Sequence, residues 1–232
     1  MRTVAQTGST NADMLGLAKA GAAEGLWLRA ERQSAGKGRQ GRGWVSEAGN
    51  LYASTLVRLR PADPPAATLA LVAAVALQDC VATYLGARAA ILKWPNDLLV
   101  AGAKLSGILL ERTADAIVIG FGVNLAHHPD LPDRPTTSLA AHGSDVAPAA
   151  FVDTLVEAFA RWRDRWRGEG LGPVRERWLA HAHPIGTALA VRLPDGEAID
   201  GLFDGLDVDG ALGLRLAGGE RRVIHAADVF LI

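Results

Sequence analysis

The chain has 232 residues, 49% of them hydrophobic, and its 24 Lys and Arg residues against 25 Asp and Glu residues give a net charge of -1. Such a chain can bury a full core and form one large or two modest domains, but its charge argues against a general nucleic-acid-binding protein, which needs a strongly basic face. The only cysteine, Cys80, excludes an intrachain disulfide and a multi-cysteine metal site, and a reducing, cytoplasmic compartment fits best.

The first predicted elements lead into a glycine-rich segment. Ser9 and Thr10 can cap a helix that stops at Gly21, and no apolar signal-peptide core precedes it. A short strand over 26–30 follows, and a second strand is expected at 51–59 after the glycine-rich segment.

A long buried helix is predicted over 64–86, with proline at its start and glycine at its end. Its apolar run is broken by Gln78 and Asp79 before it could span a bilayer, so we expect no membrane partner. The next segments read as a strand-turn-strand meander in which residues 118–125 form a central strand.

The last part of the chain changes character near Ile185. Helices are expected at 149–166 and 174–182. Beyond them, short apolar runs separated by Gly-containing turns predict a small β-barrel of about five strands. The order of elements indicates an α+β fold rather than a doubly wound one, with domains at residues 1–184 and 185–232.

The segment SAGKGRQGRGW, residues 34–44, carries four glycines and three cations. Glycines let the backbone approach a ligand and point N–H groups at an anion, which Lys37, Arg39 and Arg42 would neutralise. The segment has no Walker spacing, and G-x-G alone is weak evidence for dinucleotide binding. An ordinary solvated turn remains the alternative.

The segment KWPND, residues 93–97, follows an apolar strand. Pro95 fixes a bend that presets Lys93 to meet an anion, although an ordinary Asn-Asp turn is equally possible. Lys104 lies at a strand edge and Asn124 within a buried strand, where an amide needs hydrogen-bond partners from the protein or from a ligand. The histidines lack a third ligand at metal-binding spacing, so no transition metal is expected.

The order TGSTN, QSAGKGRQGRGW, NLYAS, KWPNDLLV, KLSGILLE and GFGVNLA resembles the catalytic domain of the biotin protein ligase (biotin-[acetyl-CoA-carboxylase] ligase) family, from about residue 7 to 125. The resemblance implies an α+β catalytic domain related to lipoyl ligases and class II aminoacyl-tRNA synthetases, followed by an SH3-like β-barrel. It also implies the reaction: biotin and MgATP give biotinyl-5'-AMP and pyrophosphate, and a lysine of a biotin carboxyl carrier domain then takes the biotin.

Site residues follow from the same resemblance. The biotin-binding residues would be Ser9, Thr10, Asn11, Gln33, Gly36, Lys37, Gly38, Arg39, Lys93 and Gly107. The residues binding ATP or the adenylate would be Arg39, Arg42, Trp44, Lys93, Asn96, Lys104 and Asn124. Lys93, Arg39 and Arg42 would be catalytic, and Asp97 would orient Lys93 or approach the incoming lysine. No side-chain motif holds a metal, so magnesium would come with ATP.

Lys37 stands where many family members carry arginine. The lysine keeps the positive charge but lacks the guanidinium group, which can donate two parallel hydrogen bonds. Because the chain begins almost at TGSTN, we expect a monofunctional ligase without a DNA-binding domain, as a monomer or homodimer. A lipoate or octanoate ligase and a non-enzymatic nucleotide- or nucleic-acid-binding protein are the competing hypotheses.

Overall fold

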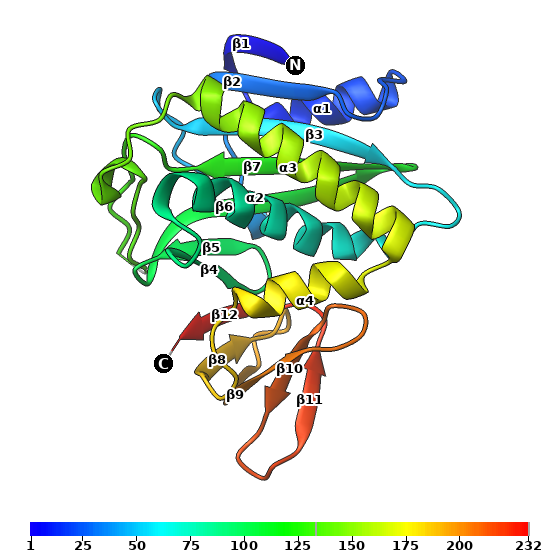
Figure 1. Cartoon of the computed structure of the whole chain (residues 1–232), viewed down its shortest axis with the longest axis vertical. Coiled ribbons are helices and arrows are strands. Elements are labelled where there is room, and N and C mark those ends of the chain that lie inside the picture. The colour runs from blue at the N-terminus through cyan, green and yellow to red at the C-terminus, as the bar shows by residue number, and fades with distance from the viewer. Residues whose placement is uncertain (133, 232) are drawn as a thin grey trace.

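The computed structural model describes residues 1–132 and 134–231 as two sheets with four α-helices (Figure 1). The first sheet contains β1 (Arg2–Thr7), β2 (Trp27–Gln33), β3 (Leu51–Arg58), β4 (Ala90–Lys93), β5 (Asp97–Val100), β6 (Ala103–Thr113) and β7 (Ala116–Val123). The second contains β8 (Ala188–Arg192), β9 (Ala198–Leu206), β10 (Leu212–Arg215), β11 (Arg221–Ile224) and β12 (Asp228–Leu231). The helices are α1 (Thr10–Lys19), α2 (Leu69–Leu85), α3 (Pro148–Glu169) and α4 (Gly172–Ala180).

The first sheet runs in the order β1-β2-β3-β7-β6-β5-β4, so β7 is its central strand, as predicted. Strands β1 and β2 pair in parallel, and the other neighbours pair antiparallel. Strand β1 was not predicted, because it is a largely exposed edge strand whose residues RTVAQT show no apolar alternation. The α+β class is confirmed.

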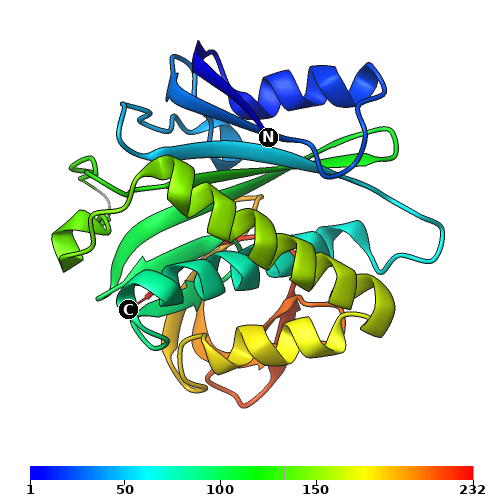
Figure 2. The ribbon, with the colours of Figure 1, turned by 45° about the horizontal axis from the view of Figure 1, so that its top comes forward.

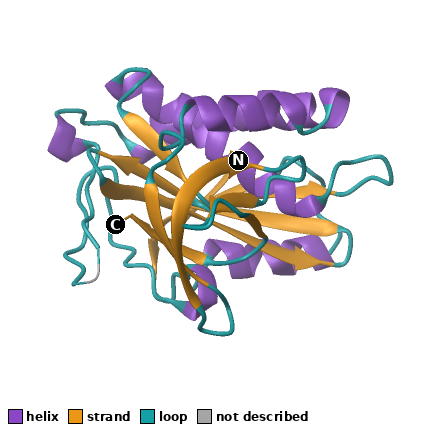
Figure 3. Cartoon of the chain, turned by 90° about the horizontal axis from the view of Figure 1, so that it is seen from below, coloured by secondary structure: helices purple, strands orange, loops and turns teal. Residues whose placement is uncertain are grey.

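Helices cover both faces of this sheet (Figures 2 and 3). On one face α1 begins at Ser9, whose hydroxyl oxygen accepts the N–H of Ala12, and buries Met14 against Leu56 and Val118. On the other face α2, which is almost wholly buried, packs beside α3. Helix α3 also contacts the sheet directly, because the ring of its Phe159 packs against Trp27 and Phe121. Among the described residues, one helical segment, Ala66–Leu85, is long and apolar enough to span a membrane by length and composition alone. However, 67% of its most apolar stretch is buried inside the protein, as in a core helix.

The second sheet lies against α4 at one end of the first (Figure 1). Trp178 of α4 packs edge-on against Phe203 of β9, with ring centroids 6.4 Å apart. The indole N–H of Trp94, which follows β4, donates to the carbonyl oxygen of Gly210. Apolar burial and this hydrogen bond therefore join the C-terminal sheet directly to the KWPND segment. The exact limits of the two domains stay a prediction; the second sheet begins at Ala188.

Candidate functional site

A cavity of about 330 Å³ lies on the face of the sheet that carries α1. Its walls come from the N-terminus of α1, the glycine-rich loop after β2, strands β4 to β7 and strand β12 of the C-terminal sheet. Of the predicted site residues, those that line it are Ser9, Thr10, Asn11, Gln33, Lys37, Gly38, Arg39, Arg42, Trp44, Lys93, Asn96, Lys104, Gly107 and Asn124. Segments that are far apart in the sequence thus line a single cavity.

The floor of the cavity is one row of residues that pair across four strands. Lys93 pairs with Asp97, Asp97 with Gly107, and Gly107 with Gly122. Residues directly opposite each other in a sheet point to the same face, so Lys93 and Asp97 rise on the same side as the two glycines. The missing side chains of Gly107 and Gly122 leave a hollow in the middle of the row.

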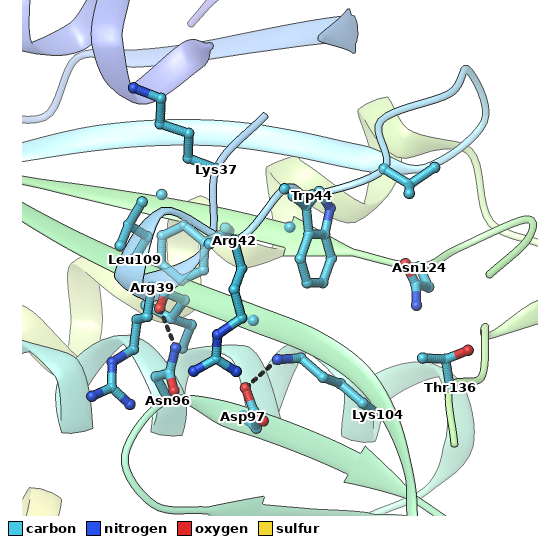
Figure 4. A pocket seen from close by; sticks show the side chains of 18 of the residues that line it. Lys37, Arg39, Arg42, Trp44, Asn96, Asp97, Lys104, Leu109, Asn124 and Thr136 are labelled. Carbon is cyan, nitrogen blue, oxygen red and sulfur yellow. Dashed lines mark hydrogen bonds and ion pairs between the residues drawn. The ribbon is translucent and has the colours of Figure 1, made fainter. Parts of the chain in front are cut away.

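Trp44 fills part of that hollow. A Cβ at Gly122 would lie 2.6 Å from Cε2 of the Trp44 indole, and one at Gly107 would lie 3.2 Å from its Cζ3. The ammonium of Lys104 lies 5.6 Å from the indole ring centroid (Figure 4). The indole N–H is buried and has no hydrogen-bond partner among the residues that the structure describes. Two glycines on β6 and β7 are therefore needed for the loop to place an aromatic ring on the sheet.

This arrangement predicts that Gly122→Ala is destabilising. The added methyl group would force the Trp44 indole out of its place, and overpacking of this kind costs about 1–3 kcal/mol. Gly16→Ala is the matched control, because that glycine lies inside α1 with open space at its Cβ and should stabilise by about 0.5–1 kcal/mol. Urea unfolding measures both; parent-like stability of Gly122→Ala would contradict the packing described here.

The end of the cavity near α1 is polar, and the residues at the start of the helix that line it, Ser9, Thr10 and Asn11, are uncharged. Oε1 of Gln33 accepts hydrogen bonds from the backbone N–H of Thr10, at 2.8 Å, and from its hydroxyl, at 3.1 Å. Oγ of the buried Ser54 lies 2.8 Å from Thr10 Oγ1 and 2.6 Å from Asn11 Oδ1. This network fixes the first turn of α1 on the sheet and points hydroxyl and amide groups at the cavity.

The opposite side is cationic. Arg39 donates from Nη1 to the carbonyl oxygen of Ala227, at 3.2 Å, and Arg42 forms an ion pair with Asp228 at 2.5 Å. Arg39 also lies 3.8 Å from Asp228. Burial lowers the pKa of Arg39, and the nearby Asp228 opposes that shift. The C-terminal sheet therefore holds the two loop arginines over the cavity.

Lys93 and Lys104 add two more cations from the sheet. Burial lowers the pKa of Lys93, reinforced by Lys104 and Arg134 and opposed by Asp97 and Asp228. Asp97 forms an ion pair with Lys104 at 2.6 Å, both side chains being largely buried (Figure 4). Of the two roles expected for Asp97, the structure shows neither directly, because its contact is with Lys104.

Of the predicted site residues, two asparagines bind the protein backbone, Lys37 is exposed, and Gly36 lies outside the cavity lining. The amide of Asn96 donates to the carbonyl oxygen of Ile108, and that of Asn124 donates to the carbonyl oxygen of Thr137, so both brace the backbone. Lys37 is exposed and extends away from the other labelled side chains (Figure 4). Gly36 is buried outside the cavity lining, where a Cβ would lie 2.7 Å from the carbonyl oxygen of Trp44.

Three residues of β12 that were not predicted also line the cavity: Asp228, Val229 and Phe230. The ammonium of Lys93 lies 5.8 Å from the ring centroid of Phe230. A single acidic residue before an apolar pair carries no motif, and its place at the cavity depends on how the second sheet packs. The sequence signal of Val229 and Phe230 is that of β-strand residues, and it gives no indication that they line a cavity.

The cavity can therefore bind a molecule with a neutral hydrogen-bonding group at one end and a strongly anionic group at the other. Its carboxylates among the described residues are Asp97 and Asp228, and each is paired with a cation. Within that part of the chain no group of three or more His, Cys, Asp or Glu residues could hold a metal ion. Fixed cations of this kind favour a phosphate-bearing ligand.

The chain is similar in sequence to known protein families and to individual proteins. The profile of the Biotin/lipoate A/B protein ligase family matches residues 5–124, and that of the Biotin protein ligase C terminal domain matches residues 188–232. The chain is 41% identical to the biotin–[acetyl-CoA-carboxylase] ligase of Paracoccus denitrificans, over 98% of both chains. It is 36% identical to that of Mycobacterium tuberculosis, over 97% of this chain and 86% of the relative.

A solved structure shares the fold. The biotin protein ligase from Aquifex aeolicus, in complex with biotin and ATP, superposes with a TM-score of 0.86 at 21% identity, covering 99% of this chain and 98% of that one. At this identity the likeness supports the α+β fold with its C-terminal antiparallel sheet.

Proposed function

Since the chain belongs to the biotin protein ligase family, as a biotin–[acetyl-CoA-carboxylase] ligase, we propose that it activates biotin with ATP and transfers it to a lysine of a biotin carboxyl carrier domain. One observation carries the proposal. A neutral, hydrogen-bonding end formed by Thr10, Asn11 and Gln33 and a cationic side formed by Lys93 and Arg39 share one cavity of about 330 Å³.

In the first step a carboxylate oxygen of biotin attacks the α-phosphorus of ATP, and the bond to pyrophosphate breaks. Two anions must meet, so fixed cations lower the barrier most where charge gathers on the phosphoryl oxygens. We assign Lys93 the contact with both the carboxylate and the phosphate, because it is a half-buried cation on the cavity floor and shares the cavity with the polar end and the loop arginines. The Asp97 ion pair holds Lys104 toward the same groups.

In the second step the amine of the acceptor lysine attacks the carbonyl carbon of biotinyl-5'-AMP, and AMP leaves. The loop arginines, held by Asp228 and the carbonyl oxygen of Ala227, would keep the reactive adenylate bound until the acceptor arrives. Magnesium fits this site as a companion of ATP, because Asp97 and Asp228 are already paired and leave the phosphates as its main ligands. Bound there, it would supply neutralisation of phosphate charge.

The test is pyrophosphate exchange into ATP by the purified protein, with biotin, lipoate or octanoate in separate reactions. We expect exchange with biotin alone, because hydroxyl and amide groups at the polar end suit a ureido ring better than an apolar chain. A mass increase of a biotin carboxyl carrier domain then tests the transfer step. Exchange with lipoate or octanoate instead of biotin would contradict the proposal, as would exchange with none of the three.

A further inference from the structure

Glu111 lies on β6 beneath the first turn of α1 and does not line the cavity. Its Oε2 accepts a hydrogen bond from Nδ2 of Asn11, a cavity residue, at 2.9 Å. The same amide nitrogen donates to the carbonyl oxygen of Leu109 at 3.3 Å. A charged side chain from outside the cavity thus contacts one of the groups that line its polar end.

These two partners determine which way the Asn11 amide faces. A carboxylate oxygen and a peptide carbonyl oxygen only accept hydrogen bonds, so the atom that meets both must be the amide nitrogen. Both of its hydrogens are used by Glu111 and Leu109. The amide oxygen consequently lies over Gly120, where a Cβ would collide with it, and accepts from Ser54 at 2.6 Å. One lone pair of that oxygen remains for a ligand.

Gln33 is oriented in the opposite sense. Its Oε1 is held by the backbone N–H of Thr10, which can only donate, and its Nε2 donates to Ser46 Oγ at 3.0 Å. A second hydrogen on Nε2 is left for a ligand. The polar end of the cavity therefore presents an acceptor at Asn11 and a donor at Gln33, the pattern complementary to a ring that carries both N–H and C=O.

We propose that Glu111 is a positioning residue that fixes Asn11 Oδ1 as the acceptor for a ring N–H of biotin, and thereby makes the site select acids that carry such a donor. The proposal rests on the proposed function. An amide at position 111 can donate as well as accept, so only the longer 3.3 Å hydrogen bond to the carbonyl oxygen of Leu109 would still hold the Asn11 nitrogen, and the Asn11 amide could turn over. Its nitrogen would then face the ligand N–H, and two donors would meet.

The test compares Glu111→Gln with the parent in pyrophosphate exchange. We expect the KM for biotin to rise about tenfold or more, because a buried hydrogen bond is replaced by a donor–donor contact. The kcat and the KM for ATP should stay within about twofold of the parent, since the phosphate side is untouched. Glu31→Gln on β2 is the matched control, with the same charge change at an exposed position outside the cavity.

A double-mutant cycle with Asn11→Ala separates positioning from general structure. If Glu111 acts through Asn11, the double variant should have the biotin KM of Asn11→Ala alone. The proposal is overturned if the two effects multiply, if Glu111→Gln leaves the biotin KM unchanged, or if the ATP KM rises equally. Failure of the proposed function would be recognised separately: the unsubstituted protein would then exchange pyrophosphate with none of the three acids.

Discussion

Replacing Lys93 with alanine is expected to lower biotin-dependent pyrophosphate exchange by about 10³-fold. Lys93 is the half-buried cation at the end of the cavity-floor row, and its ammonium lies 5.8 Å from the ring centroid of Phe230. Its removal would leave the carboxylate and the α-phosphate to approach each other without the charge between them. The two loop arginines cannot move into the gap without losing their ion pairs with Asp228.

The pH dependence gives a second measurement of the same role. Burial lowers the pKa of Lys93, so in the free enzyme its charge is lost at a lower pH than that of an ordinary lysine. Because kcat/KM reports the ionisation of free enzyme, its decline toward alkaline pH should begin below the ordinary lysine range. In Lys93→Arg, where the guanidinium stays charged, that decline should move to higher pH.

Lys19→Ala serves as the control, because Lys19 is exposed at the end of α1 and outside the cavity. It should exchange pyrophosphate at the parent rate. Parent-like exchange by Lys93→Ala would remove Lys93 from the first step.

The sequence predicts the parts of this protein that depend on local signals. The cap at Ser9, the glycine that ends α2, and the apolar run of β7 each specify an element within a few neighbouring residues. The glycine-rich segment and the KWPND segment can also be recognised as site motifs, since glycine and proline permit or impose particular backbone conformations. Lys93 and the loop arginines are found this way.

What the sequence leaves out depends on contacts between distant segments. Glu111 is one more charged residue on a strand, and only the packing of α1 on β6 brings its carboxylate to Asn11. Asp228 reaches the loop arginines because α4 and Trp94 place the second sheet beside the first. Strand β1 has no apolar pattern because it pairs at an exposed edge, so backbone hydrogen bonds alone define it.

Arg39→Gly is expected to retain adenylate formation but to release biotinyl-5'-AMP about 10- to 100-fold faster than the parent, because a charged hydrogen bond contributes about 1.5–3 kcal/mol. In the structure Arg39 is anchored by the carbonyl oxygen of Ala227 and lies 3.8 Å from Asp228, so it closes one side of the cavity. The released adenylate should biotinylate lysines of an unrelated bystander protein. Blotting of that protein and retention of labelled adenylate on the enzyme measure the two effects.

Two further variants assign the loss to the guanidinium rather than to a loosened loop. Arg39→Lys keeps the charge and a normal backbone but gives up the fork that spans Ala227 and the phosphate, so its release rate should lie between those of the parent and Arg39→Gly. Arg32→Gly changes an exposed arginine outside the cavity and should retain the adenylate. Should Arg39→Lys behave as the parent does, charge alone would hold the adenylate and the fork would be dispensable; unlabelled bystander protein with Arg39→Gly, while adenylate forms, would show that Arg39 does not retain it.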